Sequence, residues 1–363
     1  MPSSTPDDKQ PIVEALPPPP PQSATNFGLC CIVLAVSIGT AVWLKLRPPE
    51  NPANTVLWLG ASIAVPMMLL DLVFLRVYRR ESTGLDWERP FVEALGDSLQ
   101  RRLVPKLLGL AVTLVPIAVA YTNFPYYRAP FLNPFYDLLK RFALPLLVIV
   151  PLYMWFVDSR MKNPRDAYWQ LGRMAMGRTA DLVPKEIANH FLSWLVKAFF
   201  FPFMFVWLTN SARNVLGYDM SHIRWGNMPY DLGRDFLYFI DLLFCTVGYA
   251  MSFRPLDTHV RTAEPTFLGW VVALFCYPPF YDGIFEHLYV PYEHEHFGKS
   301  LAGHPSIMAM CATSILLLVA VYSSATVAFG LRFSNLTHRG ILTTGPTAGR
   351  STRPTSPRTS RGG

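Results

Sequence analysis

Long apolar segments restrict more than any other feature how this chain can fold. A helix needs about 20 mostly apolar residues to cross the hydrocarbon core of a bilayer. Eight segments reach or approach this length: 27–46, 55–75, 107–124, 142–157, 191–209, 236–253, 267–285 and 307–331. They predict an all-α fold, a polytopic transmembrane helix bundle of about eight spans with disordered N- and C-terminal tails.

Two of these segments are less regular than the others. Segment 142–157 is short for a span, which leaves a re-entrant helix open. Segment 267–285 contains Pro278, Pro279 and Asp282, so we expect its helix to kink or to end early.

The composition supports a membrane protein and argues against other classes. The chain is 51% hydrophobic and only 16% charged, whereas soluble domains average about 25% charged residues. The net charge of +7 comes largely from the C-terminal tail and the loops, so we predict no nucleic-acid partner. The five cysteines all lie in apolar segments, where they pack as small hydrophobes and form neither a disulfide framework nor a CxxC pair.

The basic residues predict the orientation of the spans. The loops 76–106 and 160–185 are the richest in Lys and Arg, and eight spans place both on one side, which the positive-inside rule makes cytoplasmic. Both termini then lie in the cytoplasm. Within these loops, 86–106 and 166–190 have near-helical apolar spacing, which fits either interfacial helices or helices packed on the protein's own surface.

Charged residues inside predicted spans are candidate functional residues. Asp71 and Asp241 are such residues, with Lys197 as a possible partner. They leave open a transporter or channel, although a single interhelical ion pair is the favoured interpretation because transporters usually show more such residues and an internal repeat.

A histidine-rich stretch near the C-terminal end is a second candidate. EHLYVPYEHEHFGKSLAGHP contains His287, His294, His296 and His304 together with three glutamates. Imidazole and carboxylate groups can bind a divalent metal. Their spacing matches no established metal motif, so a solvated loop is favoured and we predict no metal site.

The segment RFSNLTHRGILTTGP follows the last apolar segment directly. It places Arg332 and Arg339 beside the membrane and ends in a Gly-Pro turn. On physical grounds alone it is a basic anchor followed by a turn. It also resembles the segment that leads into the catalytic core of the isoprenylcysteine carboxyl methyltransferase family, in particular its large bacterial membrane relatives.

The resemblance covers about fifteen residues and the general multi-span plan. In that family a phrase such as T-x-G-P-Y-R is followed by a His-Pro-containing loop at the cofactor. The resemblance implies an S-adenosylmethionine-dependent methyltransferase, isoprenylcysteine carboxyl or phospholipid methyltransferase-like, acting on a lipophilic or prenylated acceptor at the cytoplasmic face. It assigns cofactor binding to Asn335, His338, Arg339, Thr344, Gly345 and Pro346, with Gly340 also matching the phrase; it identifies no catalytic residue.

After Pro346 the phrase stops, and residues 347–363 contain only Thr, Ala, Gly, Arg, Ser and Pro. Each of these can be encoded with G or C at the second codon position, as expected of a GC-rich gene read out of frame. With compatible codons, the frame that starts at the last base of the Pro346 codon reads Tyr-Arg-Trp-Ser-Lys-His-Pro-Ala-Tyr-Ile-Ser-Lys-Asn-Leu-Ser-Trp-Trp. We therefore expect a frameshifted, truncated family member that is inactive as written; a genuine low-complexity tail is the alternative.

The expected organisation has four parts. Residues 1–26 are a disordered Pro-rich tail, 27–306 a multi-span membrane module, 307–346 the last span and the start of the methyltransferase core, and 347–363 an out-of-frame or disordered basic tail. The expected location is a bacterial inner membrane, with the lipid bilayer as a partner. A transporter or channel and a non-catalytic membrane scaffold remain the alternative functions.

Overall fold

A computed structural model describes residues 23–49, 52–219, 228–281, 283, 301 and 303–341. The proline-rich residues 1–22 and the tail from residue 342 onward lie outside the described residues, and so do His287, His294 and His296.

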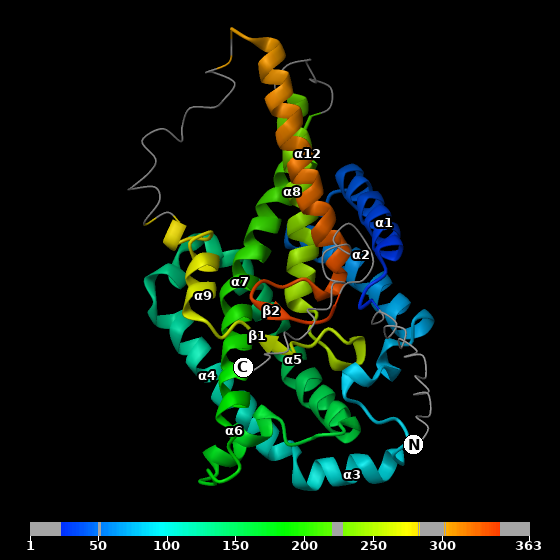
Figure 1. Ribbon diagram of the computed structural model, residues 1–363, viewed down its shortest axis with the longest axis vertical. Helices are drawn as coiled ribbons and strands as arrows, with labels where there is room; N and C mark the ends of the chain where they lie inside the picture. The colour runs from blue at the N-terminus through cyan, green and yellow to red at the C-terminus, as the bar shows by residue number, and fades with distance from the viewer. Residues whose placement is uncertain are drawn as a thin grey trace, which may run out of the picture.

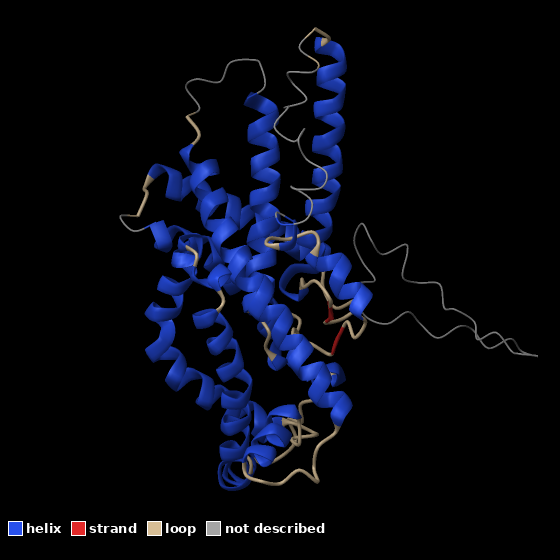
Figure 2. Cartoon of the chain, turned by 90° about the vertical axis from the view of Figure 1, so that its left-hand side faces the viewer, coloured by secondary structure: helices blue, strands red, loops and turns tan. Residues whose placement is uncertain are grey.

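The described chain is almost entirely helical (Figures 1 and 2). The α-helices are α1 (Phe27–Leu46), α2 (Pro52–Leu69), α3 (Phe91–Arg101), α4 (Leu103–Asn123), α5 (Asn133–Arg160), α6 (Ala167–Ala175), α7 (Pro184–Gly217), α8 (Met228–Ala250), α9 (Phe267–Leu274) and α12 (Pro305–Phe329). Two short strands, β1 (Thr262–Ala263) and β2 (Thr337–His338), pair antiparallel. The predicted all-α helix bundle is confirmed.

Six helical stretches are long and apolar enough to cross a bilayer. They are Phe27–Leu46, Asn54–Phe74, Leu103–Asn123, Pro130–Arg160, Pro184–Gly217 and Pro305–Arg332. Each spans at least the length that a bilayer core requires. The chain is therefore a multi-pass membrane protein.

Three expected spans differ in detail from the structure. The short segment 142–157 lies inside α5, a continuous helix of 28 residues, so it is not a short element. Segment 236–253 falls on α8, whose charged residues, among them Arg234 and Asp235, keep it out of the six apolar stretches. In segment 267–285 the described α-helix ends at Leu274, before the proline pair, as expected of a helix that ends early.

The core lies where α7 and α8 pack against each other and against the N-terminal helices (Figure 1). Phe200, Phe203, Phe239 and Phe244 are fully buried in it. Large aromatic side chains bury much apolar area, and this stabilises the contact between the two helices. The same two helices carry the residues that hold the segment after α12.

Helices α4 and α6 approach so closely that their backbones touch. A Cβ atom on Gly109 would lie 1.8 Å from the carbonyl oxygen of Tyr168, and one on Gly172 would lie 1.7 Å from that of Pro105. Both distances are far below van der Waals contact with backbone atoms, which cannot rotate away. Only glycine fits at either position.

A buried group of charges ties α3, α4, α5 and α6 together. The Asp158 side chain has no exposed surface, and its two oxygens lie 2.7 Å from Arg102 Nε and 2.7 Å from Lys106 Nζ. Lys106 also contacts Asp166 at 3.1 Å. We call Arg102, Lys106, Asp158 and Asp166 the paired cluster, because each charge in it faces an opposite one.

Candidate functional site

The segment that follows α12 folds back onto the helix bundle. Gly330 ends the helix with φ of 53°, a left-handed conformation that favours glycine. A Cβ atom there would lie 2.8 Å from Met67 Cε and 3.2 Å from Cys30 Sγ. This turn directs residues 332–341 along α8 and toward β1.

Arg332 fixes the beginning of this segment in the protein interior. Its Nη1 lies 3.4 Å from Asp71 Oδ2, and its Nη2 donates a hydrogen bond of 3.0 Å to the Leu256 carbonyl. Both side chains of the ion pair are buried. Asp71, a candidate for an ion path, therefore forms an ion pair with the segment after the last span and not with Lys197.

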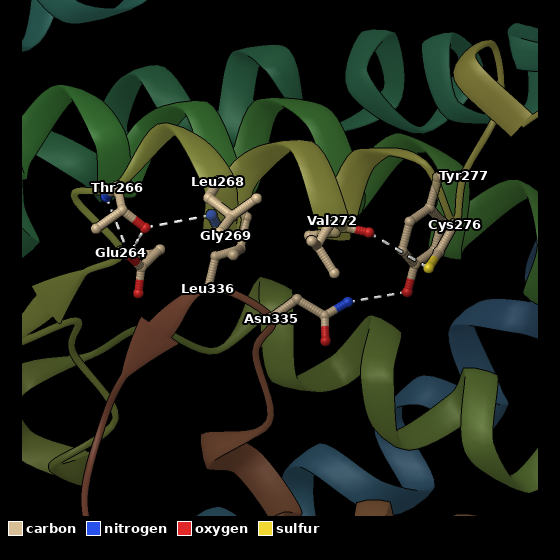
Figure 3. A pocket seen from close by; sticks show the side chains of 10 residues that line it. Glu264, Thr266, Leu268, Gly269, Val272, Cys276, Tyr277, Asn335 and Leu336 are labelled. Carbon is tan, nitrogen blue, oxygen red and sulfur yellow. Dashed lines mark hydrogen bonds between the residues drawn. The ribbon is translucent and has the colours of Figure 1, made fainter. Parts of the chain in front are cut away.

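Asn335 is held by two tyrosines from different parts of the chain. Its backbone N–H donates to Tyr249 Oη and its side-chain Nδ2 donates to Tyr277 Oη, each at 2.9 Å. Tyr249 is on α8 and Tyr277 follows α9, so Asn335 links these two elements. The side chain is thereby fixed at the rim of a groove (Figure 3).

The strand pair β1–β2 holds the end of the segment. Arg261 N–H donates to the His338 carbonyl at 2.9 Å, and Glu264 N–H donates to that of Leu336 at 2.7 Å. Asn189 of α7 braces β1, since its Oδ1 accepts a hydrogen bond from Ala263 N–H at 2.7 Å. The segment is thus attached to α7 as well as to α8.

His338, the last residue of β2, and Arg339, which follows it, differ sharply in exposure. His338 is exposed, whereas Arg339 is 2% exposed and its Nη1 donates a hydrogen bond of 2.6 Å to the Gly248 carbonyl. Burial lowers the pKa of Arg339 to about 10, so the guanidinium is still charged at neutral pH.

An open groove of about 640 Å³ runs between α9 and residues 335–336 (Figure 3). Its walls are mainly apolar, from Leu268, Val272, Ala273 and Leu336, and its polar groups come from Glu264, Thr266, Tyr277 and Asn335. Glu264 Oε1 accepts hydrogen bonds from the Thr266 hydroxyl and, at 3.0 Å, from Thr266 N–H. These bonds, the hydroxyl bond foremost, lower the pKa of the Glu264 carboxyl. The groove suits an apolar ligand with a polar end.

Three of the six expected cofactor residues are described, and they do not converge. Asn335 lines the groove, His338 points outward and Arg339 points into the bundle. Thr344, Gly345 and Pro346 lie outside the described residues. Asn335, His338 and Arg339 alone therefore do not form a complete site for S-adenosylmethionine.

The sequence interpretation missed the groove residues Glu264, Thr266 and Tyr277. The only sequence signal near them is Thr266, whose Oγ1 caps α9 by accepting a hydrogen bond from Gly269 N–H at 3.2 Å. A helix cap predicts where a helix begins and carries no information about a ligand.

The charged candidates of the spans lie apart from one another. Asp241 Oδ1 accepts a hydrogen bond of 2.5 Å from Thr326 Oγ1, and Lys197 Nζ lies 5.5 Å from the centroid of a Trp194 ring. With Asp71 bound to Arg332, the three candidates contact three different partners. Within the described ranges they form no common ion path.

No metal site is found in the part of the chain that the structure describes: it contains no group of three or more His, Cys, Asp or Glu side chains that could hold an ion. Of the histidine-rich stretch, only His304 is described, immediately before α12.

Comparison with known proteins adds no further identification, since no family model, no curated protein and no solved structure matches this chain.

Proposed function

We propose that the chain derives from a family of membrane methyltransferases that use S-adenosylmethionine, resembling the isoprenylcysteine carboxyl and phospholipid methyltransferases. The phrase RFSNLTHRGILTTGP carries the proposal. Its support from the structure is that the first half of the phrase is folded against α8 and β1, with Asn335 on the rim of a groove.

The groove supports a lipophilic acceptor. Its volume of about 640 Å³ lies within the range of about 300–1,000 Å³ typical of small-molecule sites. The apolar wall formed by α9 suits an acyl or prenyl chain, and Asn335 and Glu264 offer polar contacts at its edge. An acceptor with a long apolar chain and a polar head is the class that this lining favours.

We further propose that the residues needed to complete the cofactor site are encoded in another reading frame after Pro346. The support is the composition of residues 347–363, which shifted codons convert into Tyr-Arg-Trp-Ser-Lys-His-Pro-Ala-Tyr. This stretch supplies the His-Pro element that the resemblance calls for. The chain as written is then inactive as a methyltransferase.

Sequencing and an activity assay together test this proposal. Genomic DNA and transcript are sequenced from the Gly345 codon onward, and the chain as written is compared with the frame-restored protein for transfer of labelled methyl groups from S-adenosylmethionine to membrane lipid and to a farnesylated cysteine analogue. We expect transfer only by the frame-restored protein, and a loss of transfer on Asn335→Ala. DNA and transcript that both encode the present tail, or methyl transfer by the chain as written, contradict it.

We also propose that the basic loops face the cytoplasm of a bacterial cell, with the protein in the inner membrane. Two of the six apolar stretches precede residues 76–102 and two more precede residues 161–183. Both loops therefore lie on the side of the N-terminus, and their Lys and Arg content favours the cytoplasm. After the sixth stretch the chain returns to the same side.

The outward face of α3 supports an interfacial position for this helix. It buries its small residues Ala94 and Ser98, whereas Phe91 and Val92 are 52% and 82% exposed. A helix packed only against protein would bury its large apolar side chains instead. A helix that exposes its large apolar side chains in this way fits the boundary between lipid headgroups and acyl chains.

Thiol labelling tests the orientation. Lys162→Cys and Arg128→Cys place exposed thiols in loops on opposite sides, and the parent chain measures labelling of its own cysteines. We expect a membrane-impermeant reagent to label Lys162→Cys only in inside-out vesicles and Arg128→Cys only in right-side-out vesicles. The reverse pattern contradicts the proposed orientation.

A further inference from the structure

The buried guanidinium of Arg339 uses only part of its hydrogen-bonding capacity. The side chain is 2% exposed, and Nη1 is bonded to the Gly248 carbonyl. Its Nε and Nη2 are buried and have no hydrogen-bond partner among the described residues. These two nitrogens form one edge of the guanidinium, and that edge donates two parallel hydrogen bonds to a single carboxylate.

The surroundings of this edge contain two further buried polar atoms without a partner among the described residues. Thr337 lies in β2 and Arg339 directly follows that strand, with the exposed His338 between them. Thr337 Oγ1 is likewise buried and unpartnered within the described chain. Arg339 also interacts electrostatically with His259 and with Lys197 of α7. His259 Nδ1 is the second of these buried polar atoms.

The other buried arginine of this segment provides a direct contrast. Arg332 faces Asp71 at 3.4 Å, whereas no described carboxylate pairs with Arg339, and its burial lowers the pKa of the guanidinium. A buried cation without a counter-charge costs several kcal/mol. An anion bound at the free edge would therefore offset the cost of this buried charge.

The residues next to Arg339 lie at the protein surface. His338 and Ile341, on either side of it, are both exposed, while the Arg339 side chain is directed inward. Access of a small ligand to Nε and Nη2 therefore requires a local displacement of this segment.

We propose that the Nε–Nη2 edge of Arg339, together with Thr337 Oγ1, is a binding site for the carboxylate group of a small-molecule ligand. The planar guanidinium matches a carboxylate through two parallel hydrogen bonds, and Thr337 adds one more donor. The site is separate from the groove, which Arg339 and Thr337 do not line. It does not depend on the methyltransferase proposal.

Thermal unfolding of the full chain in detergent tests the site, with sodium acetate as the probe. Sodium chloride at equal ionic strength controls for screening, and neutral acetamide controls for the shape of acetate. We expect acetate to raise the unfolding midpoint by about 2 °C over chloride and acetamide to leave it unchanged.

Two matched substitutions assign the effect to one arginine. Arg339→Lys keeps the charge but loses the two parallel donors, so we expect the acetate effect to disappear. Arg332→Lys makes the same change at the arginine that already faces Asp71, so the acetate effect should persist although the starting midpoint is lower. Thr337→Val should reduce the effect without removing it.

Two results overturn the proposal. One is an unfolding midpoint of the parent chain that does not respond to acetate, which would mean that water or another part of this chain already satisfies the edge. The other is an acetate effect that survives Arg339→Lys at full size, which would place the bound carboxylate elsewhere.

Discussion

The paired cluster and the Arg339 edge are two solutions to the burial of positive charge. In the paired cluster, Asp158 and Asp166 face Arg102 and Lys106 at 2.7–3.1 Å. At Arg339 the described chain offers one carbonyl oxygen and no carboxylate. The first arrangement joins four helices, and the second leaves donors available. Buried charges that are paired within the fold thus stabilise it. Buried charges without a partner are candidate binding sites.

The largest effect in this comparison is expected from the loss of Asp158. Asp158→Asn leaves Arg102 and Lys106 buried without their common partner, which we expect to lower the free energy of unfolding by about 4 kcal/mol. Reversible unfolding in SDS measures the change. Asp137→Asn on the same helix removes an exposed pair with Lys140 and should cost less than about 0.5 kcal/mol. Equal effects of the two substitutions would show that the paired cluster contributes little.

The next largest effect is expected at Arg332, the buried arginine of the segment after α12 that has a counter-charge. Arg332→Met leaves Asp71 buried without its ion-pair partner and should cost about 3 kcal/mol. Adding Asp71→Asn should restore part of this loss, since the two residues interact directly. Strict additivity of the two substitutions in the same unfolding assay would argue that the ion pair is energetically unimportant.

His259, which interacts electrostatically with Arg339, should make the stability of the protein depend on pH. Burial and the nearby Arg254 lower the pKa of His259 to about 4, below its unfolded value of about 6.5. The unfolded chain therefore binds the proton first, and stability falls as pH drops from about 6.5 to about 4, by about 3 kcal/mol. His259→Gln should flatten the unfolding free energy in this window; an unchanged slope would assign it to another group.

The smallest effect is expected from Asp97, which lies at the edge of the paired cluster. The hydrogen bond from Arg102 lowers the pKa of the Asp97 carboxyl, so its contribution to stability is present above about pH 4 and is lost as pH falls through its folded value. Because the side chain is partly exposed, we expect only about 0.5 kcal/mol. Asp97→Asn should remove this part of the acid transition, and a much larger loss at pH 7 would contradict a solvent-screened pair.

The helical fold could be predicted from the sequence because apolar length alone predicts a span. The segments 27–46 and 55–75 agree closely with α1 and with the stretch Asn54–Phe74. Prediction was less accurate for α5, where Lys140, Arg141 and Asp158 are part of the helix although the apolar segment excludes them. Hydropathy measures the preference for lipid, whereas helix length also depends on pairing between charges.

The candidate site was predictable only as a segment. The sequence pointed to residues 332–346, and the structure folds the described part of that segment onto the bundle. The partners of Asn335 and Arg332 could not be predicted, because Tyr249, Tyr277 and Asp71 are brought near by helix packing over long sequence distances. The opposite directions of His338 and Arg339, at the end of β2 and directly after it, could not be predicted either, because a strand of two residues is too short to reveal its alternation in a sequence.

The close contacts of Gly109 with Tyr168 and of Gly172 with Pro105 have a mechanical consequence. Two helices whose backbones touch cannot slide past one another, since each glycine lies against a carbonyl of the other helix. Helix α6, only nine residues long, therefore moves together with α4 as one rigid unit. A hinge between moving parts of this protein has to lie outside this helix pair. A single methyl group added at either glycine would force α4 and α6 apart.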